Sequence, residues 1–169
     1  MIDCIDVNAR LFLRFIEEVL IEYFPKKYLK TYVNICKNNS SPLSGKILVD
    51  NKTDQIIGGI LGRVQATYND DDNNNPVLYI ELLAISKKYR RADCALKILK
   101  EMEQTGQDNN VAAIELHVSL GNLAALLLYY KDNFKLISIY KHFYQNAKYF
   151  QGSSTGLLLS KRIVNVGSI

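Results

Sequence analysis

The chain has 169 residues, of which 48% are hydrophobic and 22% charged, with a formal net charge of +4. This size buries roughly two-thirds of the unfolded surface, so we expect one domain over 1–169, with its core over about 5–162. Scattered basic residues favour an anionic ligand over nucleic acid. Without a signal sequence or an apolar run near ~18 residues, a soluble, non-secreted protein without a membrane span is expected. Three widely spaced cysteines without a CxxC predict neither a disulfide framework nor a metal site.

The first part of the chain predicts two helices and then two strands. Apolar residues at helical spacing indicate an amphipathic first helix, which Phe24-Pro25 ends because the residue before proline avoids the α region. Residues 2–7 form a short apolar start with no assigned element. The expected elements are a helix over 8–23, a shorter helix over 28–36, a loop over 37–45, and strands over 46–50 and 56–66 joined by a turn at 51–54.

The second part alternates strands and helices. It begins with NDDDNNNP at 69–76, whose low hydrophobicity predicts a mobile hairpin tip. The expected elements are strands over 77–85 and 112–118, helices over 94 to about 105 and 123 to about 132, strands near 136–140 and 156–161, and a frayed tail over 163–169. The predicted class is α+β, a mixed, mostly antiparallel central sheet flanked by helices on both faces.

Residues 79–95 predict a strand, a basic turn and the start of a helix. Such a turn directs unpaired backbone N–H groups at one point, beside the positive end of the helix dipole and the side chains of Arg90 and Arg91. We therefore expect a pyrophosphate to bind there. Residues 90–95 resemble the acetyl-coenzyme A (acetyl-CoA) loop of the GNAT acetyltransferases, whose pattern is Arg or Gln, two residues, Gly, one residue, and Gly or Ala. Asp93 stands in place of the first glycine.

Several separated motifs resemble one GNAT family in particular, the catalytic subunit of N-terminal acetyltransferase E (NatE, San-type). They cover roughly residues 5–162 and comprise FPKKY at 24–28, IIGGILGRV at 56–64, Tyr79 ten residues before Tyr89, IELHV ending at Val118, Asn122 with Tyr129, and Phe143-Tyr144. The resemblance implies a GNAT fold, acetyl-CoA as cofactor, and a peptide or protein N-terminus as substrate. It also implies a large helical auxiliary subunit and a second acetyltransferase catalytic subunit as partners, with a cytoplasmic location and association with the ribosome through those partners.

The resemblance also assigns site residues. The implied catalytic residues are Tyr79, His117 and Tyr129. The implied cofactor-binding residues are Leu83, Ala84, Ile85, Arg90, Arg91, Ala92, Asp93, Cys94, Ala95, Asn122 and Tyr129. The implied substrate-binding residues are Phe24, Pro25, Lys26, Tyr28, Glu81, Phe143 and Tyr144.

The reaction requires removal of a proton from an α-amino group of pKa ~8, so that the amine can attack the thioester. Neutral His117, with an ordinary pKa of ~6.5, can accept that proton through a water molecule that Tyr79 orients. Tyr129 would protonate the departing thiolate. No covalent enzyme intermediate is needed, so Cys94 is not assigned as a nucleophile.

Each assignment has a purely structural alternative. Tyr79 can be a half-buried strand aromatic, His117 a hydrogen-bonded core histidine, Tyr129 part of an apolar helix stripe, Asn122 a helix N-cap, and Phe24-Pro25 a helix stop. These alternatives stay open at the level of sequence.

Three residues depart from the family pattern at functional positions. Asp93 favours the N-cap position of the next helix and places a negative charge in the cofactor loop. Glu81 replaces an apolar residue of the peptide cleft and shares a strand face with Tyr79, about 6.6 Å away along the strand. Lys26 replaces an apolar loop residue. It can pair with Glu81 and block the pocket for an apolar first residue, or form a polar pocket with Glu81 for a different one. Glu81 is also a candidate base, less favoured than His117.

Two hypotheses follow from these observations. The chain is an N-terminal acetyltransferase, or it is a catalytically degenerate GNAT subunit that acts as a structural or regulatory component of an acetyltransferase complex. Acetylation of lysines or small amines is a weaker third reading, because Phe24-Pro25 and Phe143-Tyr144 suggest a covered peptide tunnel.

Overall fold

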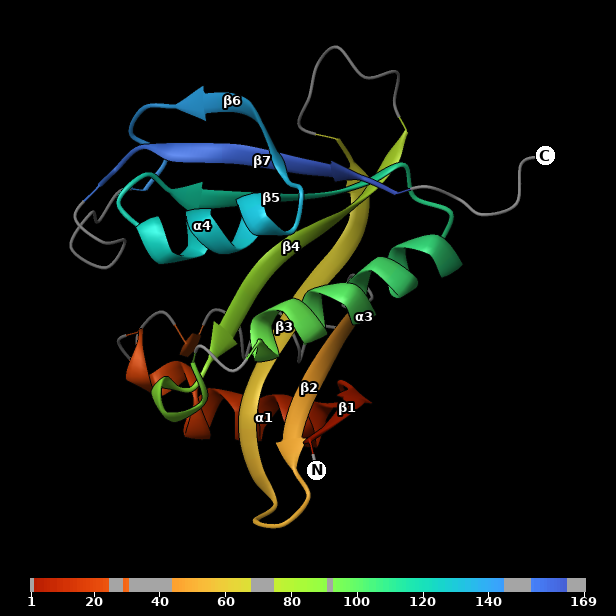
Figure 1. Ribbon diagram of the computed structural model, residues 1–169, viewed down its shortest axis with the longest axis vertical. Coiled ribbons are helices and arrows are strands. Elements are labelled where there is room, and N and C mark those ends of the chain that lie inside the picture. Colours follow the sequence, from red (N-terminus) through yellow and green to blue (C-terminus); the bar gives the residue numbers. More distant parts are fainter. Residues whose placement is uncertain are drawn as a thin grey trace. The chain divides into compact units, whose positions relative to one another are not determined.

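A computed structural model describes residues 2–24, 29–30, 44–67, 75–90, 93–144 and 153–163. The chain divides into two compact units, unit 1 with residues 1–63 and 82–102, and unit 2 with residues 64–81 and 103–169 (Figure 1). The elements are β1 (Ile2–Asp6), α1 (Ala9–Glu18), η1 (Leu20–Glu22), β2 (Ser44–Asp50), β3 (Gln55–Ala66), β4 (Pro76–Ile85), η2 (Lys87–Tyr89), α3 (Cys94–Asp108), β5 (Ala113–Ser119), α4 (Leu123–Lys131), β6 (Lys135–Tyr140) and β7 (Gly156–Arg162).

The strands follow the order β1-β2-β3-β4-β5-β7-β6 in one seven-stranded sheet. The pairs β1–β2, β2–β3, β5–β7 and β6–β7 are antiparallel, whereas β4 and β5 are parallel. The predicted α+β class with a mixed, mostly antiparallel sheet is confirmed. Within the described residues, none of the helices has the length and apolar character that crossing a membrane requires.

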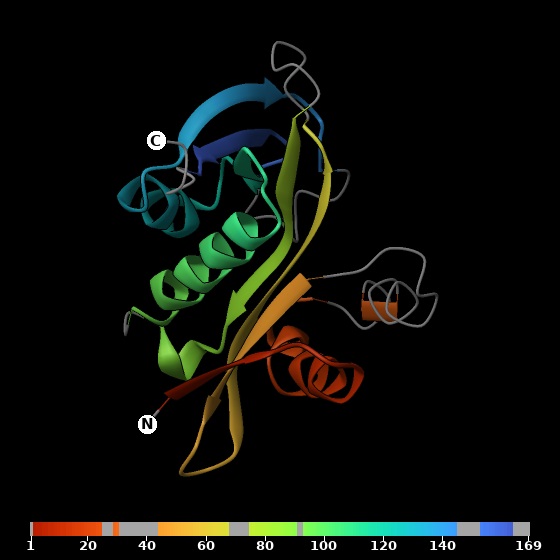
Figure 2. The same ribbon diagram turned by 90° about the vertical axis from the view of Figure 1, so that its right-hand side faces the viewer.

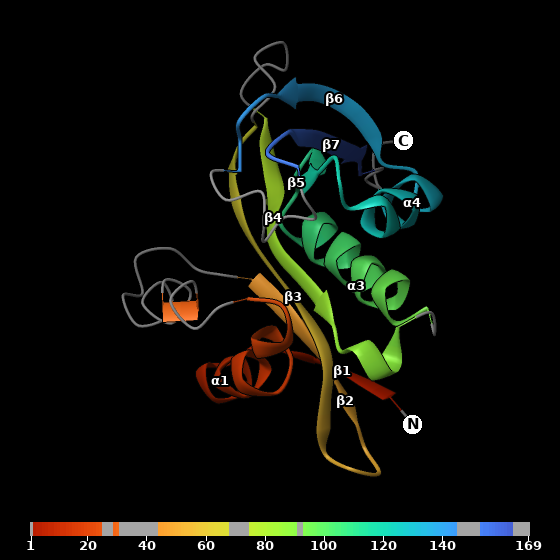
Figure 3. The same cartoon turned by 90° about the vertical axis from the view of Figure 1, so that its left-hand side faces the viewer.

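Unit 1 is built on α1 and the strands beside it. The side chain of Asn8 caps the helix by accepting a hydrogen bond from the backbone N–H of Leu11 at 2.9 Å. One face of α1 buries Phe12, Phe15 and Ile16 in a core shared with β2, β3 and the end of β4. Figures 2 and 3 show α1 on one face of these strands and the first part of α3 on the other. Helices on both faces were predicted.

Several element boundaries differ from prediction. The first helix was expected to reach Tyr23, but α1 ends at Glu18 and η1 follows. The tighter 3-10 turn, in which the N–H of Tyr23 bonds the carbonyl of Leu20, buries Leu20 completely. Ser44 was expected in a loop but begins β2, and the unassigned start forms β1, which pairs with β2. Pro76, expected in the hairpin tip, begins β4.

Other predictions fall largely outside the described residues. They are the second helix, of which residues 29 and 30 alone are described and helical, the hairpin tip before residue 75, and the tail after residue 163. The expectation of one domain over 1–169 stays a prediction.

Gly58 on β3 lies where the backbone of β4 approaches closely. A Cβ at this position would lie 2.7 Å from the carbonyl oxygen of Ala84 and closer still to the Cδ1 of Ile85. We expect Gly58→Ala to lower the free energy of unfolding by about 1–3 kcal/mol, because the strands must separate to admit the methyl group. Urea unfolding measures this, with Gln55→Ala at the exposed start of β3 as the control. Equal midpoints for wild type and Gly58→Ala would contradict the close approach.

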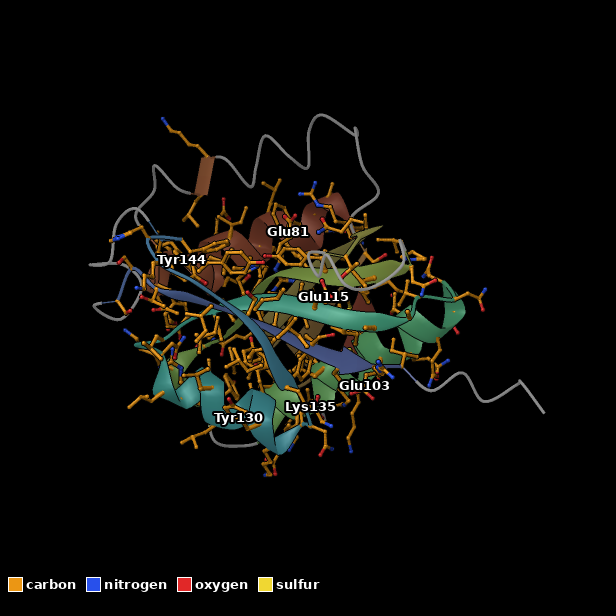
Figure 4. All side chains as sticks on the ribbon, turned by 90° about the horizontal axis from the view of Figure 1, so that it is seen from above. Glu81, Glu103, Glu115, Tyr130, Lys135 and Tyr144 are labelled. Atoms are coloured by element: carbon orange, nitrogen blue, oxygen red, sulfur yellow. The ribbon has the colours of Figure 1, made fainter. Side chains whose placement is uncertain are left out.

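Unit 2 has its core between α4 and the strands β5 and β7, beside which α4 lies in Figure 1. Leu116 and Leu159 lie opposite each other in the register and are almost fully and fully buried. After α4, Asn133 adopts the left-handed φ of 65°, and the buried Asp132 carboxylate pairs with Lys161 at 3.1 Å. Lys161 also pairs with Glu103 of α3, which Figure 4 labels.

Candidate active site

The parallel pair β4–β5 brings Tyr79 and His117 together in unit 2. Tyr79 lies opposite Glu115 in the register. Because side chains alternate along a strand, Tyr79, Glu115 and His117 share one face of the sheet. The hydroxyl of Tyr79 lies 2.9 Å from Nδ1 of His117, within hydrogen-bond distance. Two of the three residues predicted as catalytic are thus in direct contact.

Aromatic rings surround the imidazole of His117. The Phe143 ring stacks on it, with centroids 4.1 Å apart and an interplanar angle of 11°. The Tyr140 ring lies 5.3 Å away, and Tyr144 packs edge-on against Phe143 at 4.9 Å. Phe143 and Tyr144 were predicted as substrate-binding residues, whereas Tyr140 was not predicted. The sequence signal for Tyr140 is its place at the end of a predicted strand, three positions before Phe143.

Burial lowers the pKa of His117 to about 4. The desolvated ring disfavours the charged imidazolium form. At neutral pH the side chain is therefore a neutral imidazole that can accept a proton. In the tautomer whose Nδ1 carries the hydrogen, Nδ1 donates to the Tyr79 hydroxyl oxygen, which fixes the orientation of the ring and leaves the lone pair of Nε2 as the site that can accept a proton.

The lowered pKa of His117 makes folding pH-dependent. Between about pH 6.5 and 4, the unfolded chain binds a proton at this residue and the folded chain does not. Stability from neutral His117 is thus fully present above about pH 6.5 and is lost as the pH falls through this window. We expect the urea midpoint of wild type to fall more steeply from pH 7 to 4 than that of His117→Gln. Parallel curves for the two proteins would contradict a buried neutral histidine.

Two carboxylates lie on the same face of the sheet as Tyr79. Glu115 on β5 is 2% exposed, and the Thr67 hydroxyl donates to its Oε1 at 2.6 Å. Glu81, predicted as a substrate-binding residue, is half-buried two positions beyond Tyr79 on β4. Figure 4 labels both residues. Glu115 was not predicted as a site residue. The segment IELHV places it two residues before His117 and hence on the same face of the strand.

Tyr129 and Asn122 occupy α4. Tyr129 is buried, its ring lies 5.5 Å from that of Phe134, and burial raises the pKa of its hydroxyl well above the ordinary value. The hydroxyl therefore stays protonated, as a proton donor must. The Asn122 side chain accepts a hydrogen bond from the Ala125 N–H at 3.3 Å, so its N-cap role is confirmed. A role in binding the cofactor stays a prediction.

The basic turn lies in unit 1 between β4 and α3. Arg90 is exposed, with its guanidinium 4.8 Å from the centre of the Tyr23 ring. Asp93 has the left-handed φ of 53°, and its carbonyl accepts the first helical hydrogen bond, from Lys97 N–H at 2.9 Å. Glycine adopts this φ without strain, which explains the glycine of the loop pattern. Asp93 therefore holds the N-cap position of α3, as predicted, but with left-handed backbone in place of the extended backbone that is usual there.

The remaining predicted loop residues lie around this turn. Ala84, Ile85 and Cys94 are buried, Leu83 and Ala95 are partly buried, and the Ile85 carbonyl accepts a hydrogen bond from the Tyr23 hydroxyl at 2.8 Å. Burial raises the pKa of the Cys94 thiol, which suits a structural residue better than a nucleophile. Phe24 packs against the core of unit 1. Five predicted site residues lie outside the described residues: Pro25, Lys26, Tyr28, Arg91 and Ala92.

The turn fits a diphosphate group in its chemistry. Arg90, Lys87 and Lys88 supply positive charge, and α3 is a 15-residue helix whose N-terminal N–H groups begin directly after the turn. Asp93 is the one acidic residue from 86 to 95 and opposes an anion. The charges of the turn therefore suit a diphosphate group, and Asp93 is the one unfavourable charge within the turn itself.

Comparison with known proteins identifies the family. Residues 13–134 match the model of the Acetyltransferase (GNAT) family. An N-alpha-acetyltransferase of Saccharolobus solfataricus is 27% identical over 105 residues, which cover 60% of this chain and 61% of that relative. The alignment thus spans less than two-thirds of the relative's length.

Solved structures show the same fold. Arabidopsis thaliana NAA60 in complex with a bisubstrate analogue has a TM-score of 0.79 at 20% identity, covering 99% of this chain and 100% of that one. Arabidopsis thaliana Naa50 in complex with the bisubstrate analogue CoA-Ac-MVNAL has a TM-score of 0.69 at 18% identity, covering 95% and 97%. The predicted GNAT fold is confirmed, and the chain belongs to the Acetyltransferase (GNAT) family.

Proposed function

We propose that this protein transfers the acetyl group of acetyl-CoA to the α-amino group of a peptide or protein N-terminus. The observation that carries the proposal is the hydrogen bond between Tyr79 and neutral His117 at 2.9 Å. Further support comes from the archaeal N-alpha-acetyltransferase and from the fold shared with NAA60 and Naa50. The narrower assignment to a NatE-type catalytic subunit rests on the sequence motifs and belongs to the same proposal.

In this proposal His117 accepts the proton of the substrate's α-ammonium group through a water molecule. Its low pKa keeps the ring neutral at physiological pH, and Tyr79 holds both the ring and the water in place. Tyr129 carries a proton on its buried hydroxyl for the leaving sulfur. Acetyl-CoA supplies an activated thioester when bound. No residue of the chain forms a covalent intermediate.

The cofactor is assigned to the basic turn. Arg90 and Arg91 bind the diphosphate together with the N–H groups at the start of α3, including Cys94 and Ala95. Leu83, Ala84 and Ile85 at the end of β4 contact the pantetheine arm, and Ala92, Asp93 and Asn122 complete the proposed set. One lone pair of the Ile85 carbonyl is already engaged by Tyr23.

Substrate preference is assigned to Phe24, Pro25, Lys26 and Tyr28, with Glu81, Phe143 and Tyr144. Lys26 and Glu81 are charged where the family has apolar side chains, so we assign to both an effect on the first residue of the peptide that is accepted. We expect the double variant Lys26→Val/Glu81→Leu to shift preference toward peptides that begin with methionine, and the two single changes to be non-additive. Initial rates on peptides that differ in the first residue measure this. An unchanged profile in the double variant would remove both residues from substrate selection.

A second candidate function is a non-catalytic subunit of an N-terminal acetyltransferase complex. It is favoured by Asp93, because a carboxylate in the loop weakens anion binding. A large helical auxiliary subunit, a second catalytic subunit, a cytoplasmic location and association with the ribosome through these partners belong to this level of proposal. Calorimetric titration with acetyl-CoA separates the two functions, because saturable binding is required for the enzyme and not for the subunit.

A further inference from the structure

The segment that follows α1 contacts the basic turn of unit 1. No sequence motif connects these two segments. Val19 and Leu20 are completely buried and anchor the end of the helix in the core. Glu22, the last residue of η1, and Tyr23 after it contact the turn that follows β4.

Tyr23 touches both ends of the turn. Its hydroxyl donates to the carbonyl of Ile85, the last residue of β4, at 2.8 Å. The guanidinium of Arg90 lies over its ring at 4.8 Å, and the ammonium of Lys87 lies 5.8 Å from the same centroid. Both distances are in the range of cation–π attraction. Burial raises the pKa of the Tyr23 hydroxyl, so it remains a donor at neutral pH.

Glu22 holds the beginning of the turn. Its two carboxylate oxygens accept hydrogen bonds from the Ser86 hydroxyl and the Lys87 N–H, each at 3.2 Å. The N–H of Ser86 also bonds the carbonyl of Ile57 at 2.8 Å. The backbone at the start of the turn from which Arg90 projects is therefore held from two sides, by Glu22 of η1 and by Ile57 of β3.

We propose that Tyr23 is a positioning residue for acetyl-CoA binding, which holds the Arg90 guanidinium on its ring in the orientation that meets the diphosphate. A guanidinium that lies on an aromatic face keeps its charge and presents its N–H groups at its edge. Holding this long side chain before binding also lowers the entropy lost on binding. The inference rests on the proposed function, because it assumes that the turn binds acetyl-CoA.

The test is a double-mutant cycle by calorimetric titration of the full chain with acetyl-CoA. We expect Tyr23→Leu to bind about tenfold more weakly than wild type, through loss of the cation–π contact and the hydrogen bond. Tyr23→Phe keeps the ring and is expected to stay within about threefold of wild type. Tyr23→Leu combined with Arg90→Ala should bind within about threefold of Arg90→Ala alone, because the hydrogen bond to Ile85 accounts for that part of the loss and Tyr23 otherwise acts through Arg90.

Additive losses in the double variant, or a wild-type Kd in Tyr23→Leu, would overturn the positioning role while leaving the proposed function intact. Absence of acetyl-CoA binding by wild type would instead overturn the proposed cofactor and this role with it. Thermal unfolding monitors the fold of each variant. Should Tyr23→Leu fail to fold, Tyr23→Met removes the ring with a more adaptable side chain and is judged by the same two outcomes.

Discussion

His117→Ala is expected to lower kcat on a peptide amine by about 10²- to 10⁴-fold, the usual contribution of general base catalysis. The neutral imidazole accepts the α-amino proton, and none of the rings that surround it, Tyr140, Phe143 and Tyr79, is a comparable base. Steady-state rates with a saturating peptide measure kcat. Acetyl-CoA affinity, measured by calorimetry, should be unchanged because His117 has no assigned contact with the diphosphate.

His117→Gln is the matched variant for this experiment. Glutamine is polar and can still hydrogen-bond Tyr79, but it cannot take up a proton at neutral pH. We therefore expect a loss as large as that of His117→Ala. Tyr79→Phe, which removes one hydroxyl, should cost about 3- to 10-fold in kcat. Wild-type turnover by His117→Gln would show that the histidine is a packed core residue rather than the base.

Asp93→Gly is expected to tighten acetyl-CoA binding by about tenfold or more. At ~5 Å and an effective dielectric of 20 to 80, a like-charge pair costs on the order of 1 to 3 kcal/mol. Arg90 offsets part of this repulsion. Glycine also suits the left-handed φ of 53° at this position, so the backbone of the loop is preserved.

Asp93→Asn separates charge from conformation. Asparagine has nearly the same shape and tolerates left-handed backbone, but it is neutral. If repulsion dominates, Asn and Gly tighten binding by similar factors, and added salt narrows the gap to wild type. Calorimetric titrations at low and moderate salt measure both effects. Equal Kd values for all three proteins would mean that the Asp93 carboxylate points away from the bound anion.

Local pattern was sufficient to predict most elements but not the end of the first helix. The strand expected over 77–85 is β4 at Pro76–Ile85, and the helix expected from residue 94 is α3 at Cys94–Asp108. The same apolar spacing continues through Tyr23, but α1 ends at Glu18 and the chain tightens into η1 from Leu20 onward. Contacts with residues about sixty positions away, such as that of Tyr23 with Ile85, accompany this change and are invisible to periodicity.

In the candidate site, too, the sequence indicated residues but not the contacts between them. Family resemblance singled out Tyr79 and His117, but their contact depends on the parallel register of β4 and β5, which the sequence does not specify. The left-handed backbone of Asp93 was not predicted, because aspartate is a common N-cap residue and N-cap residues usually have extended backbone. Tyr23 carried no motif, and its relation to Arg90 became apparent from the fold alone.

The central claim, transfer of an acetyl group to an α-amine, is tested most directly by locating the acetyl group on a product. A peptide with a free N-terminus and one internal lysine is incubated with purified protein and acetyl-CoA, and the product is sequenced by tandem mass spectrometry. We predict acetylation at the α-amine and its loss in His117→Gln. Acetylation confined to the lysine, or no product although acetyl-CoA binds, would contradict the account.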